Sequence, residues 1–385
     1  MRRRTGPKKE HVSFRRAVLR WLRYRLADAL GFRVRPRKLR FAVTKRCNAR
    51  CVMCNAWEYP SAPTAEITPG EIRKIGERNR WFLRRVNHVS FTGGEPMLRL
   101  DLVELVRAAH QAFPRAAFNI NTNGFSAARV LSVVGEIVKF HPRLAVMVSL
   151  DGLGEVHNTV RGVPGVFPRV VETIDNLIAL GEEGKKVSVE VNFVLTNRNS
   201  DQMMPVFHFC RERGIEFNPI YPVYGQLYEN DDAEIGLERQ ITRRFLGDLA
   251  EIQRADGSLV LFELEEQLLG IPRNFDCWAG RTMFLIESDC AVFPNGSCPP
   301  GFCLGNLREF DHRFAALLRS PRARGVLRVL RQCRLCRIPC ETMTTLRGPE
   351  ALAGYLKMRH AVPRSAAGTP STSRVTEDSS RQRTP

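Results

Sequence analysis

Hydrophobic segments of strand length alternate with stretches of helical length through the first 220 residues. The strand-like segments are residues 39–44, 86–91, 118–122, 144–150, 187–195 and 215–220. Because each of the first five leads to a helical pattern before the next strand, the order predicts a parallel sheet with right-handed crossovers. Six units are too few to close an eight-stranded barrel, so we expect an α/β fold, an open partial (β/α)6 TIM-like barrel. The nearly continuous apolar run at 144–150 predicts a strand covered on both faces.

Local signals mark the start of several helices. Thr68-Pro69-Gly70-Glu71 has the form of a capping box with proline at the first helical position, and we expect its helix to reach about Arg84. Asp101 with Glu104, and then Ser126, are expected to begin the next two helices. Further helices are expected near 12–30, 168–180 and 200–213.

The same patterns divide the chain into five regions. We expect a basic amphipathic arm (1–38), the partial barrel (39–220), a helical connector (221–276), a small cysteine-rich C-terminal domain (277–345) and a C-terminal segment (346–385). This last segment ends in a tail rich in Ser, Thr, Pro and Arg, a composition typical of disorder.

The net charge of +19 is concentrated at the two ends. Residues 1–40 carry 15 Lys and Arg against 2 Asp and Glu, whereas residues 41–318 have a net charge of −4. Nucleic acid is therefore not an expected partner of the core. The helix at 12–30 is interpreted either as packed on the main domain or as an arm that docks on a membrane surface or a protein. No apolar run is long enough to span a bilayer, and arginines interrupt the N-terminal apolar pattern, so we expect a cytoplasmic protein, possibly peripheral at a membrane.

Polar or glycine-rich motifs follow four successive strands. They are the cysteine loop after residue 44, TGGEP at 92–96, NTNG at 121–124 and SLDG at 149–152. Since the carboxyl ends of parallel strands meet at one edge, these motifs predict an active site there.

Cys47, Cys51 and Cys54 form a C-x3-C-x2-C pattern in one loop. Thiolates ligate iron–sulfur clusters, and three cysteines leave one iron of a four-iron cubane without a protein ligand. That iron is free to chelate the amino and carboxylate groups of a small molecule. The alternatives are a zinc site, which prefers four ligands, and simple buried thiols.

This spacing after a first strand, with Gly93-Gly94-Glu95-Pro96 after the second, resembles the radical S-adenosylmethionine superfamily. The resemblance covers about residues 39–221 and implies a [4Fe–4S] cluster on the three cysteines. It places the GGEP segment beside the methionyl ammonium of S-adenosylmethionine, where the glycines allow close approach of the backbone and Glu95 offers an acceptor.

Further positions carry over from the resemblance. Those expected to contact the cofactor are Asn123, Ser149, Asp151, Arg161 and Asn192. Each has an alternative role as a turn or cap residue. Many members have an aromatic residue after the third cysteine, whereas this chain has Asn55 there and Trp57 two positions later.

Residues 277–340 resemble the SPASM or shorter twitch extension of the superfamily, in which cysteines around a β-hairpin hold an auxiliary cluster. MFLI (283–286) and CAVF (290–293) are expected to form the hairpin. The predicted ligands of one auxiliary [4Fe–4S] cluster are Cys277, Cys298, Cys333 and Cys336, with Cys303 as the alternative to Cys298. A zinc site built from the same thiols is the other interpretation. Cys290 stands where glycine is usual, Cys340 is a further candidate, and Cys210 is expected to be a buried helix residue.

The resemblance implies an enzyme that cleaves S-adenosylmethionine reductively to a 5′-deoxyadenosyl radical, which abstracts hydrogen from a substrate. The two substrate classes weighed are a peptide and a small sugar-like or cyclitol-like molecule. No protein residue is assigned as catalytic. The expected partners are the cofactor, the substrate and an electron donor such as flavodoxin or ferredoxin. The alternative from a different class is a non-catalytic metal-binding protein that docks on nucleic acid or a membrane through its basic ends.

Overall fold

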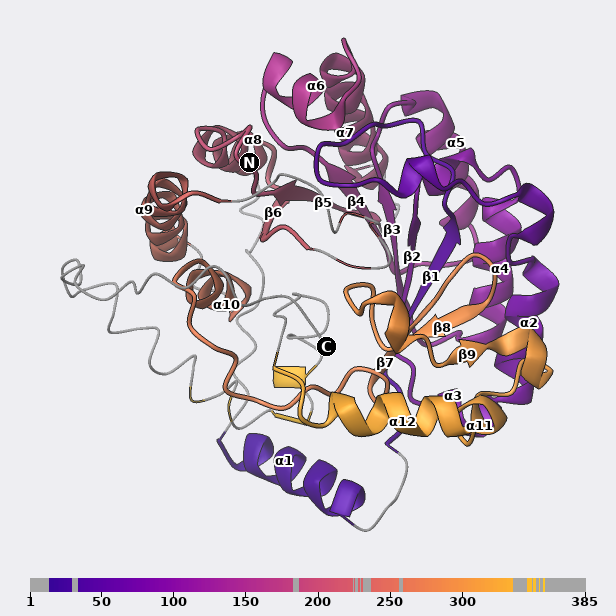
Figure 1. Ribbon diagram of the computed structural model, residues 1–385. Coiled ribbons are helices and arrows are strands. Elements are labelled where there is room, and N and C mark those ends of the chain that lie inside the picture. Colours follow the sequence, from indigo (N-terminus) through magenta and orange to yellow (C-terminus); the bar gives the residue numbers. More distant parts are fainter. Residues whose placement is uncertain are drawn as a thin grey trace.

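The computed structural model describes residues 14–29, 34–182, 187–223, 237–255 and 259–334, together with 225, 228, 230, 345–347, 349–350, 353 and 356. Within these residues one sheet has the strand order β6-β5-β4-β3-β2-β1-β7-β8-β9 (Figure 1). Its strands are β1 (Lys38–Thr44), β2 (His88–Gly93), β3 (Ala117–Thr122), β4 (Leu144–Ser149), β5 (Val187–Val194), β6 (Glu216–Ile220), β7 (Met283–Ile286), β8 (Ala291–Phe293) and β9 (Gly305–Asn306).

The first six strands pair in sequence order, and every pair is parallel. Helices cover their outer side in an arc (Figure 1). These helices are α2 (Pro69–Arg78), α3 (Arg80–Leu83), α4 (Leu102–Ala112), α5 (Ala127–Ile137), α6 (Glu155–Arg161), α7 (Phe167–Glu182) and α8 (Met203–Arg213). Because β6 and β9 remain edges of the sheet, the barrel is open, and the predicted fold class is confirmed.

The core lies between the strands and this arc of helices. Phe41, Phe91 and Phe118 stand on neighbouring strands and face the helices; their ring centroids are 6.1 Å and 5.7 Å apart in turn. All three side chains are buried, and they join the outer face of β1, β2 and β3 into one cluster. Aromatic pairs in this arrangement add to the stabilisation that burial alone provides.

The helix signals are confirmed in part. The Glu71 N–H donates to Thr68 Oγ1 over 3.2 Å, and the Thr68 N–H donates to the Glu71 carboxylate over 2.9 Å, which is the expected capping box. The expected extension to Arg84 is wrong for a single helix, because α2 ends at Arg78 and a short α3 follows. The buried Asn79 side chain interrupts the helix: it donates to the carbonyls of Ile75 and His312 and accepts the N–H of Phe314.

Strand β4 is not covered on both faces. Leu144, Val146 and Val148 are buried against helices, but Ala145, Met147 and Ser149 between them are half-buried. The inner face of the sheet therefore remains partly open, and a cavity of about 450 Å³ there is lined in part by His88, Ala145, Ser188 and Glu190. The apolar run at 144–150 was misleading because small and unbranched residues also suit a cavity wall.

The C-terminal extension joins the barrel through its own strands. β7 pairs with β1 in parallel, from Lys38 opposite Met283 to Phe41 opposite Ile286. β7 and β8 form the predicted antiparallel hairpin, and β9 adds to β8. The hydrophobic pattern of the sequence did not predict α6 or the helix α12 (Pro321–Leu330). The other helices of this half are α9 (Arg239–Ala255), α10 (Leu259–Leu268) and α11 (Phe314–Leu317).

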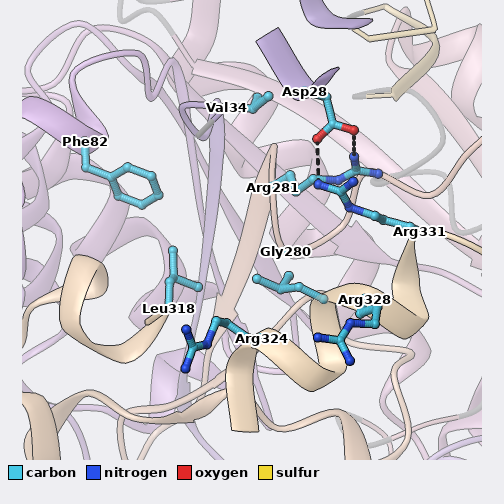
Figure 2. Close-up of a pocket in the computed structure, with 10 residues that line it drawn as sticks. Asp28, Val34, Phe82, Gly280, Arg281, Leu318, Arg324, Arg328 and Arg331 are labelled. Atoms are coloured by element: carbon cyan, nitrogen blue, oxygen red, sulfur yellow. Dashed lines mark hydrogen bonds and ion pairs between the residues drawn. The ribbon is translucent and has the colours of Figure 1, made fainter. Parts of the chain in front are cut away.

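The basic helix α1 (Phe14–Ala29) packs on the extension by one face only. Tyr24 meets the edge of Trp278 at 5.8 Å, and Arg25 pairs with Asp276 at 2.6 Å. Asp28 lies between Arg281 and Arg331, 3.2 Å from each, at the wall of a cavity of about 370 Å³ (Figure 2). The large apolar side chains exposed on the helix are those of Phe14, Leu19, Leu22 and Leu26. None of the helices in the described residues has the length and apolar character of a membrane span.

Asn79 joins the barrel to the extension, and its replacement tests how much this contact contributes to the free energy of unfolding. We expect Asn79→Ala to lower the free energy of unfolding by about 3 kcal/mol, because it leaves the buried carbonyl of His312 and N–H of Phe314 without their partner. Urea unfolding followed by circular dichroism measures this change. The exposed Gln111→Ala on α4 is the control, expected to stay within about 0.5 kcal/mol. Equal stability of the two variants would contradict the role given to Asn79.

Candidate active site

The cysteine loop begins where β1 ends and is held by backbone contacts on two sides. The N–H groups of Arg50 and Val52 donate to the carbonyls of Arg161 and Val160 at the end of α6, over 2.9 and 3.0 Å. On the other side, Asn230 donates its side-chain N–H to the carbonyl of Met53 over 2.8 Å. The loop therefore has a fixed path before any metal binds.

The three thiols are partly buried, and burial raises the pKa of each. The pKa of Cys47 rises to about 11 and that of Cys54 to about 12. Burial also raises the pKa of Cys51, and the positive charge of Arg161 opposes that rise. Two donors favour the thiolate form: the Ala49 N–H lies 3.4 Å from Cys47 Sγ, and Arg161 Nη1 lies 3.5 Å from Cys51 Sγ. The thiols are thus protonated at neutral pH, and binding of a metal centre releases their protons.

The two glycines of the GGEP segment lie where the chain crosses the cysteine loop. A Cβ on Gly93 would lie 2.2 Å from the carbonyl oxygen of Thr44, and one on Gly94 would lie 2.2 Å from that of Arg46. The N–H groups of Gly94 and Glu95 donate to these two carbonyls over 2.7 and 2.8 Å. The glycines thus permit close approach to the cysteine loop, and the conformation of Gly93, with φ of 119°, is itself one that glycine favours.

Glu95 is buried, and three donors already occupy its carboxylate. The N–H groups of Asn123 and Met97 donate to it over 2.7 and 3.0 Å, and the Thr122 hydroxyl donates over 2.9 Å. Burial raises its pKa, and these hydrogen bonds together with Arg161 oppose that rise. These bonds tie the end of β3 to the turn after β2, and the role of Glu95 as an acceptor for the cofactor stays a prediction.

A buried ion pair lies beside Cys51. Arg161 Nη2 is 2.6 Å from Asp151 Oδ2, and Asp151 Oδ1 accepts the N–H of Val194 over 2.8 Å. Burial raises the pKa of the Asp151 carboxyl, and Arg161 opposes that rise. The pair places a positive charge next to the thiolate loop and links the ends of β4 and β5 to α6.

Three further predicted residues also lie at this edge. Ser149 and Asn192 stand opposite each other on β4 and β5, and Asn192 Oδ1 is buried with no hydrogen-bond partner among the described residues. Asn123 donates to Asn48 Oδ1 over 2.7 Å. Asn48, within the cysteine loop, and Asn230 were not singled out from the sequence; for Asn48 the signal was its place between the first two cysteines.

The second cysteine group is brought together in part. Cys277 and Cys298 are buried in one cluster with Ala279 and Leu330, against which Cys333 packs. Cys303 lies in a different cluster with Ala42, Leu285 and Phe293. Cys336 and Cys340 lie outside the described residues. The buried Cys210 is on α8, as expected.

An open barrel with a three-cysteine loop at the carboxyl edge of its strands defines the class of enzyme that generates radicals from an iron–sulfur centre. The profile described as the Radical SAM superfamily matches residues 41–216. Residues 41–216 thus form a radical SAM domain, and proteins with this domain use a [4Fe–4S] cluster and S-adenosylmethionine. The chain is therefore an enzyme, and the alternative of a non-catalytic metal-binding protein is wrong.

Curated relatives match part of the chain. GTP 3′,8-cyclase of Nautilia profundicola is 27% identical over 252 residues, which are 62% of this chain and 74% of that protein. A probable GTP 3′,8-cyclase of Methanocella arvoryzae is 31% identical over 48% of this chain and 56% of its own length. Fe-coproporphyrin III synthase of Methanosarcina barkeri is 29% identical over 51% of this chain and 48% of its own length.

Two solved structures share the fold. SuiB of Streptococcus suis bound to S-adenosylmethionine has a TM-score of 0.53 and 19% identity, covering 70% of this chain and 63% of SuiB. The anSMEcpe protein with bound AdoMet and the Cp18Cys peptide has a TM-score of 0.56 and 18% identity, covering 86% and 98%.

Gly94 tests the crossing of the two backbones. We expect Gly94→Ala to lose about half of the iron that wild type binds after anaerobic reconstitution, since its Cβ would displace the Arg46 carbonyl and with it the cysteine loop, while the cysteines of the extension are unaffected. Iron content per chain measures the effect. Gly135→Ala on α5 is the matched control, because a Cβ there meets no atom within 4 Å and alanine favours the helix. Wild-type iron content in Gly94→Ala would refute the crossing as a requirement.

Proposed function

We propose that this enzyme cleaves S-adenosylmethionine reductively at a [4Fe–4S] cluster held by Cys47, Cys51 and Cys54 and abstracts hydrogen from a polar substrate. The observation that carries the proposal is the fixed loop of three half-buried thiols beside the Asp151–Arg161 pair. A cluster held by these thiols would supply one electron to the sulfonium of bound S-adenosylmethionine, so that its S–C5′ bond breaks to give methionine and a 5′-deoxyadenosyl radical.

The surrounding residues bind and orient the cofactor in this proposal. Asn192 has a buried oxygen that lacks a partner among the described residues, and Ser149 stands opposite it, so the two offer hydrogen bonds to polar groups of S-adenosylmethionine. Asn123 fixes the cysteine loop through Asn48, and the backbone at Gly93 and Gly94 supports the same loop. Arg161 keeps positive charge next to Cys51, which stabilises thiolate ligands.

The inner face of the sheet supports a polar substrate. Alternate residues of β2 to β6 point to this face, and most of them are hydrogen-bonding side chains. They include His88, Ser90, Asn119, Asn121, Glu190 and Asn218. Several bond to one another: His88 Nε2 lies 2.7 Å from Asn119 Oδ1, and Asn218 donates to Glu190 over 3.1 Å. Amide and carboxylate groups on this face match the amides of a peptide or the hydroxyls of a sugar-like molecule.

An auxiliary [4Fe–4S] cluster on the extension is the second part of the proposal. Cys277, Cys298 and Cys333 share one apolar cluster, and this supports Cys298 over Cys303 as a ligand. Cys336, three residues after Cys333 in the sequence, completes the proposed set. An electron carrier of the flavodoxin or ferredoxin type would serve the enzyme, and an acidic carrier would complement Arg324, Arg328 and Arg331 at the cavity of Figure 2.

Reductive cleavage provides the direct test. Anaerobically reconstituted protein with dithionite and S-adenosylmethionine is expected to release 5′-deoxyadenosine, detected by chromatography. The triple variant Cys47→Ala, Cys51→Ala, Cys54→Ala is expected to fall to the background of cofactor alone, because no thiolate remains to hold the cluster. Cys303→Ala, whose thiol lies in the other cluster, is expected to keep wild-type cleavage. Unchanged cleavage by the triple variant would overturn the proposal.

Iron content tests the auxiliary ligands separately. Two [4Fe–4S] clusters give about eight irons per chain, and we expect Cys298→Ser to retain about four, since only the auxiliary cluster loses a ligand. Cys303→Ser is expected to retain about eight. If the two variants exchanged these values, Cys303 would be the ligand, and if wild type itself held only about four irons, the extension would hold no cluster.

A further inference from the structure

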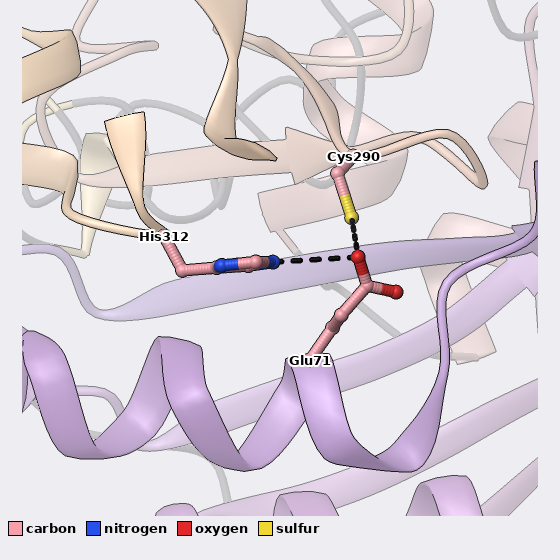
Figure 3. A group of neighbouring side chains, drawn as sticks. All are labelled: Glu71, Cys290 and His312. Carbon is pink, nitrogen blue, oxygen red and sulfur yellow. Dashed lines mark hydrogen bonds and ion pairs between the residues drawn. The ribbon is translucent and has the colours of Figure 1, made fainter. Parts of the chain in front are cut away.

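A second set of metal-binding side chains lies away from both cysteine groups. Glu71 comes from the first turn of α2, Cys290 from the turn between β7 and β8, and His312 from the loop after Leu307–Phe310 (Figure 3). Their donor atoms all lie within 4.8 Å of one another. Cys290 and His312 are buried, and none of the three belongs to the active site described above.

The distances match the edges of a tetrahedron around zinc. Glu71 Oε1 lies 3.3 Å from His312 Nε2 and 3.7 Å from Cys290 Sγ. With bonds of about 2.1 Å to nitrogen or oxygen and about 2.3 Å to sulfur, tetrahedral zinc places these atom pairs about 3.4 and 3.6 Å apart. Two of the three edges thus match a tetrahedral site, and the third, between Cys290 Sγ and His312 Nε2, is within 4.8 Å.

Two of the three residues have a positive backbone φ angle, a conformation that normally favours glycine. Cys290 has φ of 70° and His312 has φ of 59°, and with Asp311 they are the non-glycine residues of positive φ in the described chain. Such conformations cost free energy and persist where the surroundings fix them. The Leu307 N–H bonds to the Cys290 carbonyl over 3.0 Å, and the His312 N–H bonds to the Leu307 carbonyl over 2.7 Å. The fold therefore holds a cysteine and a histidine where a glycine would be easier to accommodate.

The charges around the three residues balance with a divalent ion. A thiolate from Cys290 and the Glu71 carboxylate neutralise Zn²⁺, and the thiol proton leaves to solvent on binding. Arg308 donates to both oxygens of Glu71, over 2.7 and 3.2 Å, and orients the carboxylate as hydrogen-bonded partners of metal ligands do. Asp289 acts electrostatically on both Arg308 and Cys290, so its charge offsets that of the guanidinium.

We propose that Glu71, Cys290 and His312 bind one zinc ion, with water as the fourth ligand, and that this ion fastens the extension to helix α2. The side chains of Glu71 and His312 remain 14% and 10% exposed, which gives water access to the fourth position. The site joins residues more than 200 positions apart in the sequence, at the place where Asn79 already bridges to the carbonyl of His312. Its role is structural and does not depend on the proposed reaction.

Metal analysis of the full chain, purified anaerobically with zinc present and then reconstituted with iron and sulfide, tests this site. We expect about one zinc per chain, and X-ray absorption at the zinc edge should show a single sulfur among nitrogen and oxygen ligands. Zinc misplaced at the cluster cysteines would instead show several sulfurs, so the spectrum separates the two locations.

Cys290→Gly is the decisive variant, because glycine fits φ of 70° and the loss of the ligand is not confounded by backbone strain. It is expected to lose the zinc, and its melting temperature should no longer fall on addition of EDTA, as that of wild type should. Cys303→Ser serves as the matched control and should retain the zinc. Equal zinc content in Cys290→Gly and wild type, or no zinc in wild type, would reduce the three residues to a hydrogen-bonded contact and overturn the proposal.

Discussion

The close crossing of three backbone segments at the carboxyl edge of the sheet is the constraint on which the active site depends. The carbonyls of Thr44, Arg46 and Arg50 approach Gly93, Gly94 and Gly162 so closely that a Cβ on any of these glycines would lie 2.0 to 2.2 Å from a carbonyl oxygen. Hydrogen bonds from the same segments fix the path of the cysteine loop. Three thiols of one short loop can share a cluster only if this path is set, so the glycines act on the metal centre through the backbone and not by contact.

Buried charged groups also stabilise the edge of the sheet at which the backbone segments cross. Arg161 pairs with Asp151 and reaches Cys51, while Glu95 is held by donors from the ends of β2 and β3. Leaving any of these groups without its partner would strand a charge or an acceptor in the interior, which costs several kcal/mol. The polar residues at the strand ends therefore form two bonded groups, one around Asp151 and Arg161 and one around Glu95, and both stabilise the same edge of the sheet.

Much of this arrangement is legible in the sequence. The strand order, the capping box at Thr68 and the motifs at the strand ends are local signals, and local signals predict them correctly. The break at Asn79 and the pairing of β7 with β1 depend on residues more than 100 positions away, so no local pattern contains them. The cluster of Glu71, Cys290 and His312 was not predicted for the same reason. Its one signal in the sequence is Cys290 at a position where glycine is usual.

The pairing of β1 with β7 also sets the spacing of the two cysteine groups. The strand that leads into the cysteine loop is hydrogen-bonded to the strand that follows Cys277, so one backbone ladder fixes how the two groups are offset along the strands. A slip of two residues in that ladder would keep every side chain on its face yet move one group by about 6.6 Å along the strand. For the two clusters proposed above, such a slip would change the distance over which an electron passes between them. The register from Lys38 to Phe41 therefore fixes the spacing of the two groups and also joins the extension to the barrel.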